Sequence, residues 1–234
     1  MIHFIFIGFL LTMPAAIAAN NVPDTMAERV KSCTICHGDK DKIEQHAYYP
    51  SINGKPKGYL FNQLRNFRDR RRHYQPMAVL LENMSDNYLM EIAHYFSMLQ
   101  LPASPPEQIK MQSNEIRLAE QLIFSGFSDR NIPACSACHG EALMGIEPFI
   151  PGLLGLSRTY ITAQFGSWRN GGLIRGQVSD CMSEIANKLT DNEIIAIAKW
   201  LATRPVSGKP GPVEALSPEL AHRCSSIVLV DTEE

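Results

Sequence analysis

The sequence predicts an all-α protein composed of two similar, small helical domains in tandem. Three observations lead to this fold class. Apolar residues recur at the three- and four-residue spacing of helices, and the chain repeats itself at an offset of about 101 residues. In addition, no segment alternates polar and apolar residues convincingly enough for a strand, apart from SSIVLV near the end of the chain.

The composition is that of a soluble globular protein. Charged residues make up 20% of the chain, apolar residues 45%, and the formal net charge is −2. This balance gives no electrostatic footprint for nucleic acid, so we expect no nucleic-acid partner. A peripheral contact with a membrane surface stays open.

The N-terminal residues 1–19 predict a signal peptide. They are apolar and end in small residues, including the Ala16-Ile17-Ala18 form that a signal peptidase cuts. The alternative is an uncleaved anchor, because the segment is just long enough to span a bilayer. We expect export to a periplasm of the Gram-negative type, where cysteine pairs can be oxidised.

The rest of the chain divides into two domains, a linker and a tail. Residues 20–101 form the first predicted domain and residues 113–204 the second. Residues 102–112 are the linker, in which prolines prevent helix continuation. Residues 205–234 have no counterpart in the first half and form a C-terminal extension.

Each domain is expected to open and close with an amphipathic helix. The opening helices are predicted around residues 26–33 and 116–123. The closing helix of the second half begins with TDNE, a capping box with Thr190 as N-cap and Glu193 at N3. The predicted buried stripes of the closing helices are Leu89, Ile92, Ala93 and Phe96 in the first half, and Ile194, Ile197, Ala198 and Leu201 in the second.

The repeat extends over most of both halves. An offset of 101 pairs Pro50 with Pro151, Tyr59 with Tyr160, Gln63 with Gln164, Phe67 with Trp168, and Arg68 with Arg169. An offset of 105 then pairs Met77 with Met182, Ser85 with Thr190, and Asp86 with Asp191. The two halves are therefore copies of one domain.

Each half contains the pattern Cys-x-x-Cys-His-Gly, as CTICHG and as CSACHG. Residues i and i+3 share a helix face, so both thiols can bond to one porphyrin while the next residue, a histidine, ligates its iron. Zinc and a redox dithiol are the alternatives, but the extra histidines, the export and the missing strand–helix context disfavour them. We predict two covalently bound haem c groups, attached through Cys33, Cys36, Cys135 and Cys138, with His37 and His139 as axial ligands.

A methionine follows each motif at an aligned position. Met77 and Met182 each stand eight residues before the predicted N-cap of a closing helix. A thioether is a soft, neutral ligand that suits Fe(II). Methionine is more often a core residue, and Met84 and Met90 are rivals in the first half, but only Met77 has an aligned equivalent. We predict Met77 and Met182 as the second axial ligands.

Together these residues resemble the cytochrome c4 family, bacterial two-haem electron carriers built from two class I cytochrome c domains. The resemblance covers about residues 25–203 and rests on the two cysteine motifs, the aligned Pro-Tyr-Gln-aromatic-Arg block and the two methionines. It implies an all-helical fold with both haems close together near the domain interface. It also implies that the carbonyls of Pro50 and Pro151 accept a hydrogen bond from the proximal histidines and fix the imidazole orientation.

The resemblance implies a soluble periplasmic electron carrier, not an enzyme, that serves a terminal oxidase, a quinol-oxidising complex or another periplasmic redox protein. One alternative is an electron-accepting subunit of a periplasmic dehydrogenase, such as a flavocytochrome sulfide dehydrogenase. The other is a haem enzyme acting on peroxide or thiosulfate, which would require an open or thiolate-ligated iron.

Two further features of the sequence lie outside the haem motifs and the aligned methionines. Cys181 and Cys224 are the cysteines outside the haem motifs, and their even count and the predicted export favour a disulfide between them. The alternative is that the Cys181 thiolate ligates iron, which the alignment of Met182 disfavours.

The densest basic run, RNFRDRRRHY at residues 65–74, is interpreted as a solvated helix end, with a docking patch for an acidic partner as the alternative.

Overall fold

The computed structural model describes residues 23–38, 48–99, 105–171 and 181–206. The predicted signal peptide, Cys224 and most of the C-terminal extension, including SSIVLV, lie outside the described residues. The helices within these ranges are all too short or too polar to cross a membrane. The domain limits given above stay predictions.

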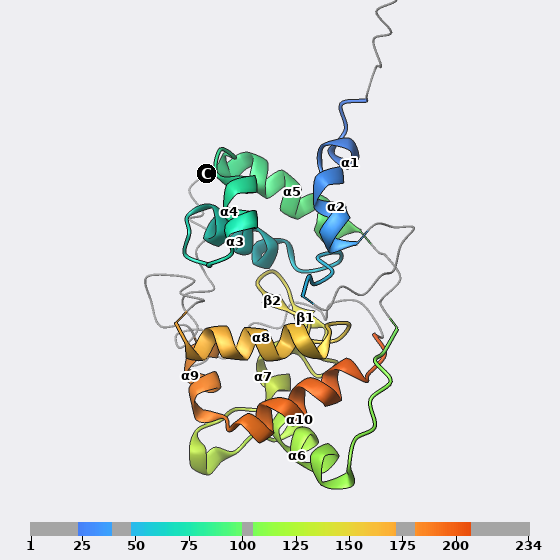
Figure 1. The fold of residues 1–234 in the computed structure, drawn as a ribbon, viewed down its shortest axis with the longest axis vertical. Helices are drawn as coiled ribbons and strands as arrows, with labels where there is room; N and C mark the ends of the chain where they lie inside the picture. Colours follow the sequence, from blue (N-terminus) through green and yellow to red (C-terminus); the bar gives the residue numbers. More distant parts are fainter. Residues whose placement is uncertain (1–22, 39–47, 100–104, 172–180, 207–234) are drawn as a thin grey trace, which may run out of the picture.

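The first half is a bundle of short helices, shown in blue to green in Figure 1. In the described residues these are α1 (Met26–Arg29), α2 (Lys31–His37), α3 (Lys57–Arg68), α4 (Gln75–Leu81) and α5 (Asp86–Met98). Helix α5 packs against α3, and its predicted stripe, Leu89 to Phe96, is at most 3% exposed. The stripe is therefore confirmed as the buried face of the closing helix.

The second half repeats this plan. Its elements are α6 (Ser113–Phe124), η1 (Ser128–Arg130), α7 (Cys135–His139), β1 (Gly145–Ile146), β2 (Ile150–Pro151), α8 (Arg158–Arg169), α9 (Cys181–Lys188) and α10 (Asp191–Ala202). Helix α10 packs on α6 and α8. It begins with the predicted capping box: Thr190 Oγ1 accepts from the Glu193 N–H, and Glu193 Oε2 accepts from the Thr190 N–H at 2.7 Å.

A small hairpin is the part of the fold that the sequence did not reveal. Strands β1 and β2 pair antiparallel, with Gly145 opposite Pro151 and Ile146 opposite Ile150. The expectation of no strand here is wrong, because two-residue strands are too short to show an alternating pattern. Gly145 has φ +92°, and a Cβ at this position would lie 2.4 Å from the Ile150 carbonyl oxygen, so the hairpin requires glycine.

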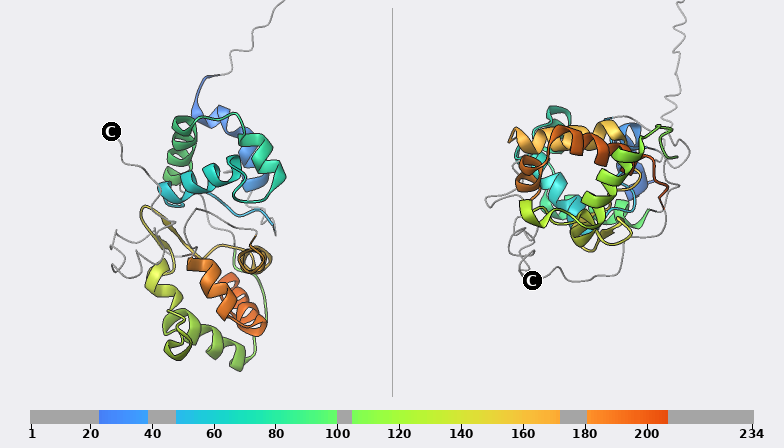
Figure 2. Two further views of the ribbon diagram at one scale, coloured as in Figure 1. Left: turned by 90° about the vertical axis from the view of Figure 1, so that its left-hand side faces the viewer. Right: turned by 90° about the horizontal axis from the view of Figure 1, so that it is seen from below.

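The two halves form two lobes, each with its own hydrophobic core (Figures 1 and 2). The hairpin loop of the second lobe reaches the start of α3 in the first. There the Tyr59 N–H donates to the Pro148 carbonyl oxygen at 3.1 Å. A Cβ on Gly58 would lie 2.4 Å from the Phe149 ring, so the backbone of α3 lies directly on that loop. This close approach fixes how the lobes meet.

Candidate haem sites

Helices α2 and α7 present the two cysteine motifs. Each helix ends at the histidine of its motif, His37 or His139, and a glycine follows directly. Gly38 has φ +95° and Gly140 has φ +81°. This left-handed region is readily open only to glycine. The glycine of the motif therefore lets the chain leave the helix immediately after the candidate ligand.

Both histidines make the backbone contact that the resemblance implied. The Nδ1 atom of His37 donates to the Pro50 carbonyl oxygen at 2.8 Å, and that of His139 donates to the Pro151 carbonyl oxygen at 2.7 Å. Burial lowers the pKa of both imidazoles, and the carbonyl contact opposes this only in part. Each ring is thus neutral, with Nε2 carrying the lone pair, which is the form that ligates iron.

The candidate ligands of both halves face one cavity. It has a volume of about 690 Å³, mainly apolar walls and contributions from both lobes. All the predicted site residues that the structure describes line it. These are Cys33, Cys36, His37, Pro50, Met77, Cys135, Cys138, His139, Pro151, Cys181 and Met182. The structure therefore brings the two sites together at the boundary between the lobes.

The chemistry of the thiols fits attachment to haem better than a redox dithiol. Burial raises the pKa of the Cys135 thiol to about 12 and also raises the pKa of Cys33. Redox-active cysteines instead have lowered pKa values. Thiols at i and i+3, a neutral imidazole and an apolar cavity are the donor set and the environment that haem c needs.

The methionines are placed consistently in the two halves. Met77 on α4 and Met182 on α9 are partly buried, and each packs against the core of its own lobe. Met84 also lines the cavity, so it remains a rival of Met77, whereas Met90 packs on the core outside the cavity lining. Cys181 is the first residue of α9 and is 8% exposed. Cys181 is disulfide-bonded, so the alternative of a Cys181 thiolate ligand is wrong for this structure. Its pairing with Cys224 stays a prediction, because Cys224 lies outside the described residues.

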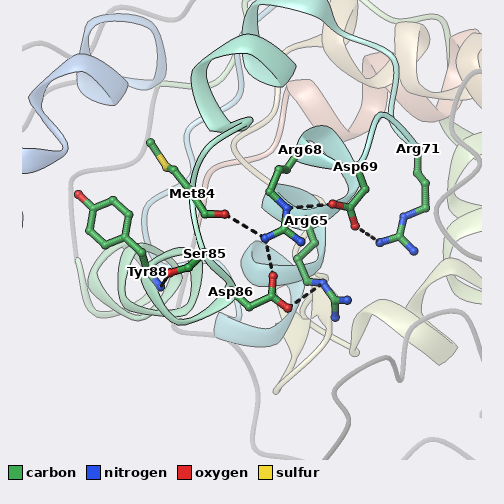
Figure 3. Close-up of polar contacts among 8 residues, drawn as sticks. All are labelled: Arg65, Arg68, Asp69, Arg71, Met84, Ser85, Asp86 and Tyr88. Carbon is green, nitrogen blue, oxygen red and sulfur yellow. Dashed lines mark hydrogen bonds and ion pairs between the residues drawn. The ribbon is translucent and has the colours of Figure 1, made fainter.

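The basic run at residues 65–74 is largely charge-compensated within its own lobe, as Figure 3 shows. Arg68 pairs with Asp69 at 2.9 Å and with Asp86 at 2.5 Å. Arg65 lies 3.6 Å from Asp86, and Arg71 pairs with Asp69 at 2.5 Å. Most of this positive charge is therefore engaged inside the lobe, which favours neither a simply solvated helix end nor a free docking patch.

The aligned arginines and aspartates perform the same task in both halves. Arg68 donates to the Met84 carbonyl oxygen at 3.1 Å as well as pairing with Asp86 (Figure 3). Arg169 donates to the carbonyls of Ala186 and Leu189 and pairs with Asp191. In each lobe the arginine ties the end of α3 or α8 to the start of the closing helix. It thereby anchors the segment that follows the candidate methionine.

Sequence analysis missed the special position of Arg72. This residue is 8% exposed and lies between the lobes. Its guanidinium donates to Gln63 at 2.7 Å, to Gln164 at 2.8 Å and to the Tyr160 hydroxyl at 3.3 Å. Within a run of arginines nothing marked it as buried. Arg72 lies between the two aligned blocks of the repeat, where the offset changes from 101 to 105, so the repeat gave no equivalent for it either.

The helical two-lobed fold and the two cysteine motifs facing one cavity define a two-domain class I c-type cytochrome. No protein-family model matches the chain. The thiosulfate dehydrogenase electron acceptor of Thiomonas intermedia is 34% identical over 176 residues, which cover 75% of this chain and 80% of that protein. Cytochrome c4 of Pseudomonas aeruginosa is 29% identical over 198 residues, covering 83% of this chain and 96% of that one.

A solved structure shows the same fold. The structure of cytochrome c4 from Acidithiobacillus ferrooxidans superposes with a TM-score of 0.62 at 24% identity, covering 75% of this chain and 99% of that chain. The chain belongs to the cytochrome c4 family and is a two-haem electron carrier with two covalently bound haem c groups. The predicted fold class, cofactors and carrier function are thereby confirmed.

Proposed function

We propose that this carrier accepts electrons from a periplasmic dehydrogenase that oxidises thiosulfate and passes them to a respiratory redox protein such as a terminal oxidase. Two findings support the choice of donor. The relative with 34% identity is named as the electron acceptor of thiosulfate dehydrogenase, and the chain covers 80% of it. The cytochrome c4 relative has a lower identity of 29%.

The repeat and the cavity support one set of residues for each cofactor. Cys33 and Cys36 would hold one haem, and His37 and Met77 would ligate its iron. Cys135, Cys138, His139 and Met182 would hold and ligate the second haem. When bound, each haem supplies a one-electron iron couple, and the chain sets the potential through the neutral imidazole and the soft thioether.

The observation that best supports a carrier function is that both aligned methionines line the same cavity as both histidines. A histidine and a methionine would together complete the ligand set of each iron and would leave no position for a substrate. The chain is therefore a carrier and not itself a peroxidase or a thiosulfate-oxidising enzyme, because those activities need an open or cysteine-ligated iron.

The carrier works in the periplasm after removal of residues 1–19, which lie outside the described residues. Intact-mass measurement on the protein purified from a periplasmic fraction tests this directly. The expected mass is that of a chain that begins near Asn20 and carries two haems. A full-length chain in the membrane fraction would show that the N-terminal segment is an anchor instead.

The donor is tested by reduction of the purified, oxidised holoprotein. Three mixtures are compared by the rise of the reduced-haem absorbance: thiosulfate alone, thiosulfate with a thiosulfate dehydrogenase catalytic subunit, and sulfide with a flavoprotein sulfide dehydrogenase subunit. We expect rapid reduction of both haems only in the second mixture.

Each other result contradicts a defined part of the proposal. Catalytic oxidation of thiosulfate, or consumption of peroxide, by the chain alone would show that it is an enzyme. Reduction by the flavoprotein but not by the thiosulfate dehydrogenase would assign it to the flavocytochrome alternative. Reduction in none of the three mixtures would leave a carrier with a different donor.

A further inference from the structure

The cavity shared by the two candidate haem sites opens to solvent on the side of the first lobe. Among the described residues that line it, every exposed one belongs to the first lobe, whereas those of the second lobe are all buried or half-buried. The exposed group includes Cys36, Tyr48, Tyr74, Pro76 and Leu80. Cys36 is one of the two thiols that would hold the first haem. The opening therefore leads to the attachment side of the first site.

Large apolar side chains surround this opening. Tyr48 is 70% exposed, and Tyr74 and Leu80 are each at least 40% exposed. Val79 adjoins Leu80 on α4, and Ile35 adjoins Cys36 on α2; these two are 51% and 77% exposed. A group of exposed apolar side chains beside a cavity is typical of a binding surface. The five residues Ile35, Tyr48, Tyr74, Val79 and Leu80 are called the first-lobe rim.

Two side-chain contacts join the first-lobe rim to the candidate iron ligand. The hydroxyl oxygens of Tyr74 and Tyr49 are 3.0 Å apart and share a hydrogen bond. The ring of Tyr49 in turn packs edge-on against the ring of His37, with 6.4 Å between the ring centroids. A solvent-exposed phenol is thus connected to the proximal histidine through one hydrogen bond and one ring contact.

The second lobe uses the equivalent of this segment to contact the first lobe. At the offset of 101, Phe149 is aligned with Tyr48 and Ile150 with Tyr49. Phe149 lies against the backbone of Gly58 at the start of α3, and Ile150 is buried in β2. The side chains that remain open to a partner in the first lobe are therefore engaged within the molecule in the second.

The remaining rim positions also differ between the two halves. The second half has Ala137 where the motif of the first half has Ile35, and it has Glu184 at the position aligned with Val79. Both halves are haem domains, so a domain of this type does not need exposed apolar residues here to hold its haem. The first-lobe rim therefore has a task that the second lobe does not share.

We propose that the first-lobe rim is the docking surface for the electron donor and that electrons enter the carrier at the first haem. Among the donor's surfaces, the one that fits is mainly apolar and surrounds its own redox cofactor. The rim itself is apolar and phenolic, and Asp69 and Asp86 engage arginines of the adjoining basic run. Aromatic side chains in a weakly charged patch are typical of the centre of an interface. The proposal deepens the proposed function and rests on it for the class of donor.

The transfer itself is a one-electron step. One electron leaves the reduced cofactor of the docked donor and is taken up by the ferric iron of the first lobe, and no bond forms or breaks. The rim excludes water from the contact and brings the donor close to Cys36 and His37. The second iron then receives its electron through the first, because the described second-lobe lining offers a partner no exposed side chain.

The test introduces the same charge at the equivalent exposed position of each motif. Ile35→Glu and Ala137→Glu holoproteins are mixed with the reduced catalytic subunit of a thiosulfate dehydrogenase, and stopped-flow absorbance gives the second-order rate constant. Reduction by hydroquinone, a small neutral reductant, corrects for any change in reduction potential. We expect Ile35→Glu to lower the corrected rate constant about tenfold, because a charge would be buried in an apolar interface. Ala137→Glu should stay within about twofold of wild type.

A larger loss in Ala137→Glu than in Ile35→Glu, or no loss in either, would overturn the proposal. If Ile35→Glu does not take up both haems, Val79→Glu decides, since the second lobe already has a glutamate at the aligned position. Ile195→Glu is its control, because Ile195 is an exposed isoleucine on α10 outside the cavity lining. Val79→Glu should lose rate and Ile195→Glu should not; equal rates would overturn the proposal.

A measurement without a partner separates the entry site from the identity of the donor. A neutral paramagnetic relaxation agent is added to the wild-type holoprotein, and the broadening of the haem methyl signals is followed by nuclear magnetic resonance. The signals of the first haem should broaden more, with Met77→Ala and Met182→Ala spectra assigning each set. Equal broadening, or stronger broadening of the second set, would overturn entry at the first haem. A wild type that the dehydrogenase subunit does not reduce would overturn the proposed donor alone.

Discussion

The two lobes use the same helices to present the haem residues, yet they stabilise those helices with different charges. In both lobes a proline carbonyl holds Nδ1 of the proximal histidine. In both lobes an arginine ties the helix that carries the Tyr-x-x-x-Gln pattern to the start of the closing helix. The contacts that recur are therefore those that position the candidate haem ligands.

The contacts that differ lie at the closing helix and at the interface. In the second lobe Glu193 completes the capping box and pairs with Arg130 at 2.5 Å. In the first lobe Tyr88 stands at the aligned position, and Ser85 caps α5 without a reciprocal carboxylate. The first lobe instead supplies the cationic groups of the interface. Duplication thus kept the haem-holding contacts in both copies, while the remaining positions became specialised.

The largest effect should appear when the two proposed methionine ligands are removed one at a time, with the same result in each lobe. Met77→Ala and Met182→Ala should each convert one of the two irons from low spin to high spin, because the thioether that fills the sixth position is lost. The reduction potential of that haem should fall, since the thioether favours Fe(II). Electron paramagnetic resonance of the oxidised proteins measures the change.

Met84→Leu is the matched control for this experiment. Met84 lines the same cavity as Met77, and the second lobe has Leu189 at the aligned position. We expect its spectrum to equal that of wild type. A high-spin signal in Met84→Leu and a normal spectrum in Met77→Ala would assign the ligand to Met84.

The next effect concerns the arginines that anchor the closing helices. Arg169→Ala should lower the free energy of unfolding by about 3 kcal/mol, because it leaves the carbonyls of Ala186 and Leu189 and the Asp191 carboxylate without their donor. Arg68→Ala should lower it by about 2 kcal/mol for the corresponding contacts. Urea unfolding followed by circular dichroism measures both, with exposed Arg70→Ala as a control. Equal losses in all three variants would show that these contacts do not anchor the helices.

The pH dependence of the free energy of unfolding should differ between mutations in the two lobes. The Arg130 guanidinium lowers the pKa of Glu193, so the folded-state pKa lies below the ordinary value of about 4.3. A lowered carboxyl pKa stabilises the fold above the unfolded-state pKa, and this contribution is lost as the pH falls through the folded-state pKa. Glu193→Gln should therefore be less stable than wild type at pH 7, by about 2 kcal/mol, and the difference should shrink below pH 4.5.

Thermal unfolding across pH 3 to 7 measures this response. Glu91→Gln, at an exposed position on α5, serves as the matched carboxylate control and should show no such convergence. A stability difference for Glu193→Gln that stays constant down to pH 3 would contradict the assigned role of the Arg130 pair.

The smallest effect is expected at the N-caps. Thr190→Ala removes the hydroxyl of a complete capping box, and Ser85→Ala removes a cap that accepts only from the Tyr88 N–H. We expect losses of about 1 kcal/mol for each, with the larger loss at Thr190. Chemical unfolding of the two variants side by side measures the difference, and a larger loss at Ser85 would contradict the comparison.

The elements that sequence predicted well are those with a strong local signal. The closing helices follow from their apolar stripes, and the cap at Thr190 follows from a four-residue pattern. The haem motifs follow from the spacing of Cys33, Cys36 and His37 and from its recurrence in the second half. Such signals are local because side-chain spacing within one helix determines them.

The features that sequence could not predict depend on contacts between distant segments. Arg72 looks like its neighbouring arginines in the sequence. Only its contacts with Gln63 of the first lobe and Gln164 of the second make it a buried group between the lobes. Likewise, Arg68 at the end of α3 pairs with Asp86 at the start of α5, although α4 lies between them in the sequence. Such pairing depends on tertiary geometry, so the basic run was interpreted from composition alone.

The most direct test is to measure the spin state of both irons in the oxidised holoprotein. Optical and electron paramagnetic resonance spectra, recorded through a reductive titration, give this spin state. Two low-spin histidine–methionine signals that both disappear on reduction are the predicted result, because both methionines line the cavity with both histidines. A high-spin or thiolate-type signal from either iron would contradict the carrier assignment and would point to chemistry at that haem.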